Sequence, residues 1–234
     1  MKTISTQEIS DCVYRLARKA GLTLIPSCLQ SLEEAKKRET GATAFALETL
    51  LENARVAKNE NMPVCQDTGM SVVLIELGQE VALTGAPLLD AVNDGVRRAY
   101  ADGNFRKSVC DPLTRENTGD NTPAQLHMEI VAGDKIKITY LPKGFGSENM
   151  SRLYMLTPAE GKEGILRAIT ETVKLAGSRP CPPVYVGVGI GGTFDGCALL
   201  AKKALTREVG SRNPRKDVAE IEKEALKCIN ELNI

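Results

Sequence analysis

This sequence of 234 residues contains one histidine and has a formal net charge of zero. The single histidine, His127, leaves little scope for histidine-based zinc catalysis, which in most enzymes draws on several imidazoles. Thirty basic residues balance thirty acidic ones, so we expect neither nucleic acid nor an acidic membrane as partner. No apolar run approaches the roughly 18 residues of a membrane span, and the first residues lack a signal-peptide pattern. We therefore expect a cytoplasmic protein.

The seven cysteines form no CxxC pair, and an odd number of thiols in a cytoplasmic chain argues against a disulfide scaffold. Two of them, Cys65 and Cys181, adjoin prolines in polar loops, where no apolar packing calls for a thiol. The others are interpreted as structural, with the first and last of them on apolar helix faces: Cys12, Cys28, Cys110, Cys197 and Cys228.

The hydrophobic pattern predicts a mixed α/β fold, with a helical amino-terminal third followed by a mixed sheet with flanking helices. A single domain over residues 1–234 is expected, because no linker, repeat or low-complexity segment interrupts the chain. The first helix should run from a capping box at Ser5–Glu8 to a stop at Gly21. Further helices are predicted at 27–39, 42–58, 87–103, 158–176, 195–206 and 214–231, and strands at 71–77 and 183–190, with a hairpin over 125–140.

Four polar or glycine-rich loops adjoin the predicted strands, and such loops commonly carry function. They are CQDTG (65–69), NTGDNTPA (117–124), PKGFGSENMS (142–151), and RPCPP followed by GVGIGG (179–192). A cysteine thiolate such as Cys65 can bind iron, while Gln66 and Asp67 offer further contacts or a proton carrier. A reactive or merely buried thiol is the alternative interpretation.

For several other candidate site residues, a structural role is the favoured interpretation. The glycines of GVGIGG match the dinucleotide-binding pattern GxGxxG, but close packing of a strand on a helix is the favoured interpretation. His127 is interpreted as a structural residue of a strand, and Arg97 and Arg98 as a solvated helix face. For Arg106, in the short polar run NFRKS, a carboxylate-binding role and a surface role remain equally open.

Taken in order, these motifs resemble the alpha subunit, or amino-terminal domain, of the class I fumarate hydratases and the related L-tartrate dehydratases. The resemblance rests on PVCQDTG, NTGDNTPA, PKGFGSENMS, PCPPVYVGVGIGGTF and AKKAL, and extends from about residue 5 to the end of the chain. Two of these, NTGDNTPA and KGFGSENM, are more similar to the fumarase branch than to the tartrate branch.

The resemblance implies a 4Fe-4S cluster held by three cysteines, with one iron open to a small dicarboxylate substrate. Cys65 and Cys181 match two of the ligand cysteines, and Gln66, Asp67 and Arg106 match residues that contact the dicarboxylate, with Asp67 as the catalytic candidate. The loop around Gly146 matches a segment that approaches the substrate with backbone groups. The implied reaction is the hydration of fumarate to malate in the tricarboxylic acid cycle, by an oligomer that includes a beta subunit.

In alpha subunits of this kind, the helix that resembles EKEALKCINELNI precedes a further strand and the third ligand cysteine, and Cys228 lies within that helix. We therefore expect a chain that lacks the family's carboxyl-terminal segment and the third ligand. Three other hypotheses remain open: an L-tartrate dehydratase alpha subunit, a remnant without a cluster that serves as an assembly partner, and a dinucleotide-binding protein.

Overall fold

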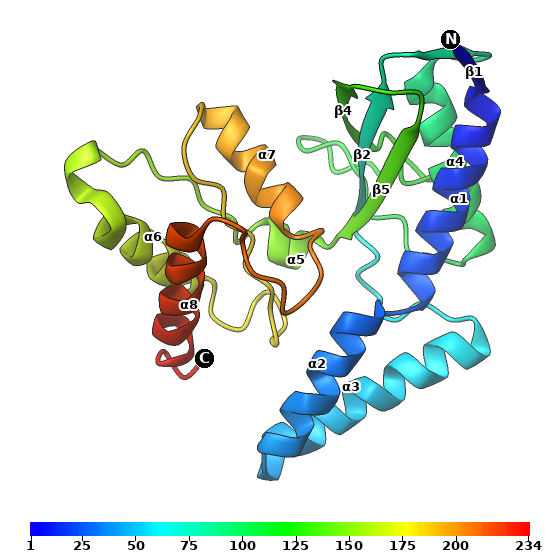
Figure 1. Cartoon of the computed structure of the whole chain (residues 1–234). Helices are drawn as coiled ribbons and strands as arrows, with labels where there is room; N and C mark the ends of the chain where they lie inside the picture. The colour runs from blue at the N-terminus through cyan, green and yellow to red at the C-terminus, as the bar shows by residue number, and fades with distance from the viewer. The chain divides into compact units, whose positions relative to one another are not determined.

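A computed structural model describes residues 1–234 and confirms the mixed α/β fold (Figure 1). The chain divides into two compact units, Met1–Phe145 and Gly146–Ile234, which are described separately. A single functional domain over the whole chain stays a prediction. The capping box is present, because the Ser5 hydroxyl and the Glu8 carboxylate both cap the start of α1 (Thr6–Leu22).

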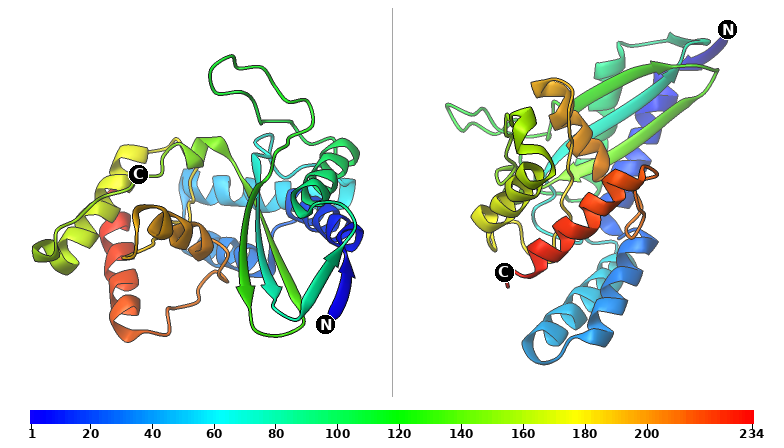
Figure 2. Two further views of the ribbon diagram at one scale, coloured as in Figure 1. Left: turned by 90° about the horizontal axis from the view of Figure 1, so that it is seen from above. Right: turned by 60° about the vertical axis from the view of Figure 1, so that its left-hand side comes forward.

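The first unit contains a three-stranded sheet of β2 (Met70–Gly78), β4 (Gln125–Val131) and β5 (Ile136–Lys143), in the order β4-β2-β5. The predicted hairpin over 125–140 is wrong in its pairing, although both of its strands exist. Figure 2 shows β2 between them, parallel to β4 and antiparallel to β5. The segment that joins β4 to β5 therefore crosses the end of β2.

The composition of β2 explains this order. Val72, Val73 and Ile75 are buried, so β2 is the most apolar strand and takes the central place. Gly78 lies where the chain crosses, and a Cβ there would lie 2.5 Å from the carbonyl oxygen of Gly133. The crossing is closed by backbone bonds such as that from the Gly78 amide to the Lys135 carbonyl, 2.8 Å long.

One face of the sheet packs on α1 and on α4 (Leu88–Asp102), which lie side by side (Figure 1). The buried core formed there includes Ile9, Val13, Val73, Ile75, Val92, Val96, Tyr100 and Phe105. The predicted helix stop at Gly21 is wrong, since α1 continues to Leu22. Gly21 instead leaves room for the ring of Phe105, which a Cβ at this position would meet.

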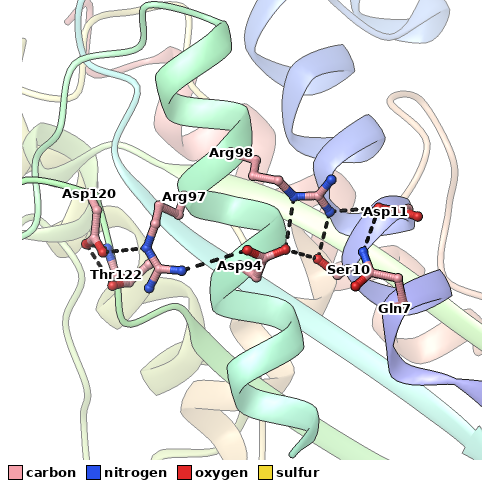
Figure 3. A network of polar contacts seen from close by, with 8 residues as sticks. All are labelled: Gln7, Ser10, Asp11, Asp94, Arg97, Arg98, Asp120 and Thr122. Carbon is pink, nitrogen blue, oxygen red and sulfur yellow. Dashed lines mark hydrogen bonds and ion pairs between the residues drawn. The ribbon is translucent and has the colours of Figure 1, made fainter. Parts of the chain in front are cut away.

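A polar network joins the same two helices at their surface (Figure 3). Arg98 on α4 donates to Ser10 and Asp11 on α1, each at 2.8 Å. Its Nε lies 2.9 Å from the Asp94 carboxylate. The two groups form an ion pair, but the geometry at Nε is not that of a hydrogen bond. Arg97 donates to Asp120 at 2.9 Å. Both arginines therefore join segments rather than only cover a solvated helix face.

The remaining elements of the first unit are peripheral. The short strands β1 (Lys2–Ser5) and β3 (Val81–Thr84), neither of them predicted, pair in parallel. Helices α2 (Pro26–Arg38) and α3 (Gly41–Glu60) follow the predicted ranges closely and pack on each other. They form a helical hairpin beyond the end of α1 (Figure 1).

The second unit is built from helices. After the short α5 (Phe145–Glu148) and a 3-10 turn at Pro158–Glu160 come α6 (Gly161–Ala176), α7 (Phe194–Ala204) and α8 (Lys216–Asn230), and α6 packs on α8. The predicted strand at 183–190 is wrong, since neither sheet includes this segment. A strand needs a hydrogen-bonded neighbour as well as a β-branched sequence, and the second unit contains no strand.

Candidate functional site

The loop CQDTG leads directly into β2. Cys65 is exposed, and the backbone amide of Asp67 donates to its sulfur at 3.4 Å. An N–H donor at a thiol stabilises the thiolate, the form that binds metals. Gln66 is also exposed, next to Cys65, whereas Thr68 and Gly69 are buried. The loop therefore presents its first residues to solvent and anchors its last ones in the unit.

Two glycines allow this loop to lie against the end of β5. A Cβ on Gly144 would lie 2.7 Å from a carboxylate oxygen of Asp67, so the carboxylate occupies space that any other residue would fill. Gly69 has a φ of +67°, and a Cβ there would meet the Lys143 carbonyl. This positive φ favours glycine. The close contacts hold Asp67 beside the start of PKGFGSENMS.

Beneath the loop lies a buried polar layer. The Tyr100 hydroxyl donates to the carbonyls of Thr68 and Gly69, at 2.8 and 3.2 Å. Tyr140 and Ser71 share a hydrogen bond of 2.6 Å. Burial raises the pKa of Tyr100, and raises that of Tyr140 well above its ordinary value, so both phenols remain neutral near neutral pH.

The structure brings Arg106 to the same loop. The Thr68 hydroxyl donates to the Arg106 carbonyl at 2.6 Å, and the arginine is exposed. Gln66, Asp67 and Arg106 thus belong to two segments that are bonded to each other. An exposed arginine beside a carboxamide and a carboxylate suits the recognition of an anion with several carboxyl groups.

A residue that sequence reasoning did not single out, Asn121 of NTGDNTPA, connects these two segments. It is completely buried, and its carboxamide bonds to Gly69 and to the amides of Ser108 and Val109. The neighbouring Asp120 accepts from Thr122 and Arg97. Although its burial acts in the opposite direction, these bonds hold the pKa of Asp120 below its ordinary value. The motif itself was the available signal, since asparagine is rarely buried without a bonding role.

The second unit carries the other sequence-predicted residues. Cys181 is exposed, and its φ of +60° follows the turn closed by its amide and the Ser178 carbonyl at 3.0 Å. Gly146 is exposed at the start of this unit, beside Glu148, which pairs with Lys202 of α7. Because Cys65 and Cys181 belong to different units, their binding of one cluster stays a prediction.

The glycines of GVGIGG pack closely against α7. A Cβ on Gly187 would meet the Ala201 carbonyl and Leu205, and one on Gly189 would meet the Cys197 carbonyl. No strand precedes the motif, so the strand–turn–helix context of a dinucleotide site is missing. The favoured interpretation, close packing on a helix, therefore agrees with the contacts, although the packed segment is not a strand.

The remaining candidates are half-buried. His127 lies in β4 opposite Leu74 of β2, and the five other cysteines are half-buried free thiols rather than fully buried ones. The chain forms no group of three or more His, Cys, Asp or Glu side chains that could hold a metal ion. None of its helices combines the length and the apolar character of a membrane span.

Comparison with known proteins identifies the family. A family model described as fumarate hydratase (Fumerase) matches residues 10–234. The chain belongs to this family. One relative is the putative L(+)-tartrate dehydratase subunit alpha of Methanocaldococcus jannaschii. It is 40% identical to this chain over 97% of this chain and 82% of its own length. The L(+)-tartrate dehydratase subunit alpha of Escherichia coli strain K12 is 31% identical over 100% of this chain and 78% of that protein.

The family match confirms the resemblance drawn from the ordered motifs, and membership supports a hydro-lyase. Of the residues expected to act in this fumarate hydratase-family chain, Asp67 is half-buried and the others are exposed: Cys65, Gln66, Arg106, Gly146 and Cys181. In the first unit, the buried hydrogen bonds of Thr68 and Gly69 hold the segments that carry Cys65 and Arg106.

Proposed function

We propose that this chain is the alpha subunit of a hydro-lyase that hydrates fumarate reversibly to malate in the cytoplasm, and that it acts with a beta subunit. Its family membership supports the reaction class, and the two relatives named above are themselves called alpha subunits. The beta subunit would supply the remaining side chains that bind the substrate and transfer protons.

The observation that carries the proposal is the bonded pair of segments in the first unit. An exposed thiol, Cys65, accepts an amide hydrogen bond and lies three residues before Thr68, whose hydroxyl binds the Arg106 carbonyl. A potential metal ligand and a potential carboxylate-binding cation are thereby held by one short connection. This is the combination that a dicarboxylate hydro-lyase requires.

Cys65 and Cys181 would supply two of the three cysteine ligands of a 4Fe-4S cluster. Their chemistry suits such a cluster, because both are exposed thiols and the Cys65 sulfur already accepts a hydrogen bond from a backbone N–H. When bound, the cluster would supply an open iron that acts as a Lewis acid toward the hydroxyl of malate, which eases the loss or addition of hydroxide. The chain's own residues bind and orient the substrate: Gln66 and Arg106 hold its carboxylates, the backbone around Gly146 approaches it, and Asp67 holds a proton on a carboxylate oxygen.

L(+)-tartrate is the second candidate substrate. It is favoured by the names of the relatives at 40% and 31% identity, each of which is called a tartrate dehydratase subunit alpha. Both substrates are four-carbon dicarboxylates that gain or lose water, so the same loops serve either reaction. The difference would lie in the groups that meet the second hydroxyl of tartrate.

The test is anaerobic reconstitution with iron and sulfide, on the chain co-produced with its beta subunit, followed by assays on fumarate and on L(+)-tartrate. We expect a brown complex that contains iron and hydrates fumarate. Cys65→Ser and Cys181→Ser should each lose the colour and at least about 100-fold of the activity. Cys228→Ser, a matched change at a half-buried thiol of α8, should retain both.

Each other outcome has a distinct meaning. Turnover of tartrate without turnover of fumarate supports the second candidate. A complex that binds iron through neither Cys65 nor Cys181 contradicts the cluster assignment. A colourless, inactive chain that still binds its beta subunit identifies an assembly partner rather than a catalytic subunit.

A further inference from the structure

Asn121 is a fully buried polar side chain near the candidate site, with 0% of its surface exposed. It follows a run of exposed residues, 111–119, and precedes β4. Its φ of +62° lies in the left-handed region, which asparagine tolerates better than most residues. The chain thus turns sharply to bring one carboxamide into the interior.

The carboxamide bonds on both sides. Its Oδ1 accepts from the backbone amides of Ser108 and Val109, at 2.7 and 3.2 Å. Its Nδ2 donates to the Gly69 carbonyl at 3.1 Å. One planar group therefore joins the segment that follows Arg106 to the residue that ends the CQDTG loop.

A second connection joins the same segments closer to the site. The Thr68 hydroxyl bonds to the Arg106 carbonyl at 2.6 Å, one residue before Gly69 and two residues before Ser108. Two parallel connections prevent the segments from sliding or rotating past each other, as a single bond would allow. Without Asn121, the Thr68 bond would remain as a direct hydrogen bond between the two segments.

We propose that Asn121 is a positioning residue, whose carboxamide holds the Cys65–Gly69 loop in register with Arg106. This inference rests on the proposed function only in naming those segments as the site. Asn121 itself does not touch substrate in this scheme, because it is fully buried. It determines where the exposed groups of both segments are presented.

The test uses Asn121→Asp, because a neutral carboxyl group keeps one donor and one acceptor and can reproduce the connection. An ionised carboxylate has only acceptors and would face the Gly69 carbonyl. The titratable groups near this carboxamide include Tyr100, which donates to the same carbonyl, and Asp120, which pairs with Arg97. Burial raises the pKa of Tyr100, and hydrogen bonds lower that of Asp120 despite its burial, so neither changes charge between about pH 5 and pH 9.

Hydrogen exchange of the full chain measures the connection without substrate. In Asn121→Ala, which removes their acceptor, we expect the Ser108 and Val109 amides to exchange about tenfold faster than in the wild type at pH 5 and at pH 9, after correction for the intrinsic rate. In Asn121→Asp both amides keep a carboxyl oxygen as acceptor and should stay protected, whereas the Gly69 carbonyl loses its donor when the carboxyl group ionises. Asn59→Asp, a matched change at an exposed residue of α3, should change neither amide.

A functional arm uses the reconstituted complex. We expect kcat/KM of Asn121→Asp to fall about 10- to 100-fold at high pH and to recover as the pH is lowered, relative to Asn59→Asp. Unchanged protection of Ser108 and Val109 in Asn121→Ala overturns the proposal. An equal loss of protection throughout α8 overturns it as well, because it would show general unfolding. Normal kcat and KM in a complex with loosened segments overturns it too. An inactive wild type contradicts only the proposed function, since the exchange results then decide on Asn121.

Discussion

At the scale of single residues, the hydrogen atom of Gly144 makes room for a carboxylate. Any Cβ at this position would lie 2.7 Å from an Asp67 oxygen, closer than normal contact allows. The two partners are therefore coupled: Asp67 keeps its place only while residue 144 is glycine. Neither residue alone shows this in the sequence, because it depends on the loop and the end of β5 coming together.

Gly144→Ala is expected to displace the Asp67 carboxylate while the fold is kept. Because Asp67 is the proposed proton carrier, we expect kcat of the reconstituted complex to fall about 10- to 100-fold, with a smaller change in KM. Steady-state kinetics on fumarate measure this. The control, Gly196→Ala in α7, adds a Cβ near only the Thr193 hydroxyl. Equal kcat for the two variants would refute the coupling.

At the scale of secondary-structure elements, α1 and α4 are joined by charge at the surface as well as by apolar packing. The hydrogen bond from Arg98 holds the pKa of Asp11 below its ordinary value of 3.8. A carboxylate with a lowered pKa in the folded state contributes stability above its unfolded pKa. This contribution is lost as the pH falls through the lower, folded pKa.

Acid should therefore weaken the connection between α1 and α4. We expect the melting temperature of the wild type to fall more between about pH 5 and pH 3 than that of Asp11→Asn, which has no charge to lose. Thermal unfolding at low ionic strength measures the difference, and salt should reduce it. Glu34→Gln, on the exposed face of α2, serves as control. Parallel pH profiles for Asp11→Asn and the wild type would contradict the prediction.

The elements also mark the limit of what the sequence predicts. Capping and periodicity predicted the helices and β2, because those signals are local. The place of β2 between β4 and β5 depends on contacts between segments far apart in the chain. The one local sign of it in the sequence was Gly78, at the end of an apolar strand. The segment 183–190 has a strand's composition, but a strand also needs a neighbour, which local sequence does not reveal.

The site shows the same division. The motifs predicted Cys65, Asp67 and Arg106 as residues of interest, and the structure explains how the first unit holds them. The sequence did not single out Asn121, because its role depends on hydrogen bonds to two residues that lie far apart in the chain, Gly69 and Ser108. The sequence motifs predict which side chains can bind a metal or a substrate. The buried hydrogen bonds that position those side chains can be identified only from the folded structure.

At the scale of the whole molecule, the two units differ in how much core each contains. The first unit has a contiguous cluster of buried apolar side chains between the sheet and two helices. In the second unit the buried apolar residues are only Ile169, Val173, Ala176 and Ala225. Since conformational entropy opposes folding everywhere, a unit with so little burial has a small margin of stability.

We therefore expect a fragment of residues 1–145 to unfold cooperatively in urea, and a fragment of residues 146–234 to show a shallow, non-cooperative transition. Circular dichroism against urea concentration measures both, with the full chain as the reference. The first fragment should retain most of the stability of its unit, because its core residues all precede Phe145. A sharp transition in the second fragment would show that helix packing alone suffices.

The apolar segment 184–190 has a consequence for how the protein is made. Its side chains are substantially exposed, from 36% at Val184 to 52% at Tyr185, although the sequence favours a strand. Such a segment on a newly synthesised chain is a template for pairing with another chain. Self-association is second order in concentration, whereas folding is first order, so the soluble yield should fall as the rate of synthesis rises.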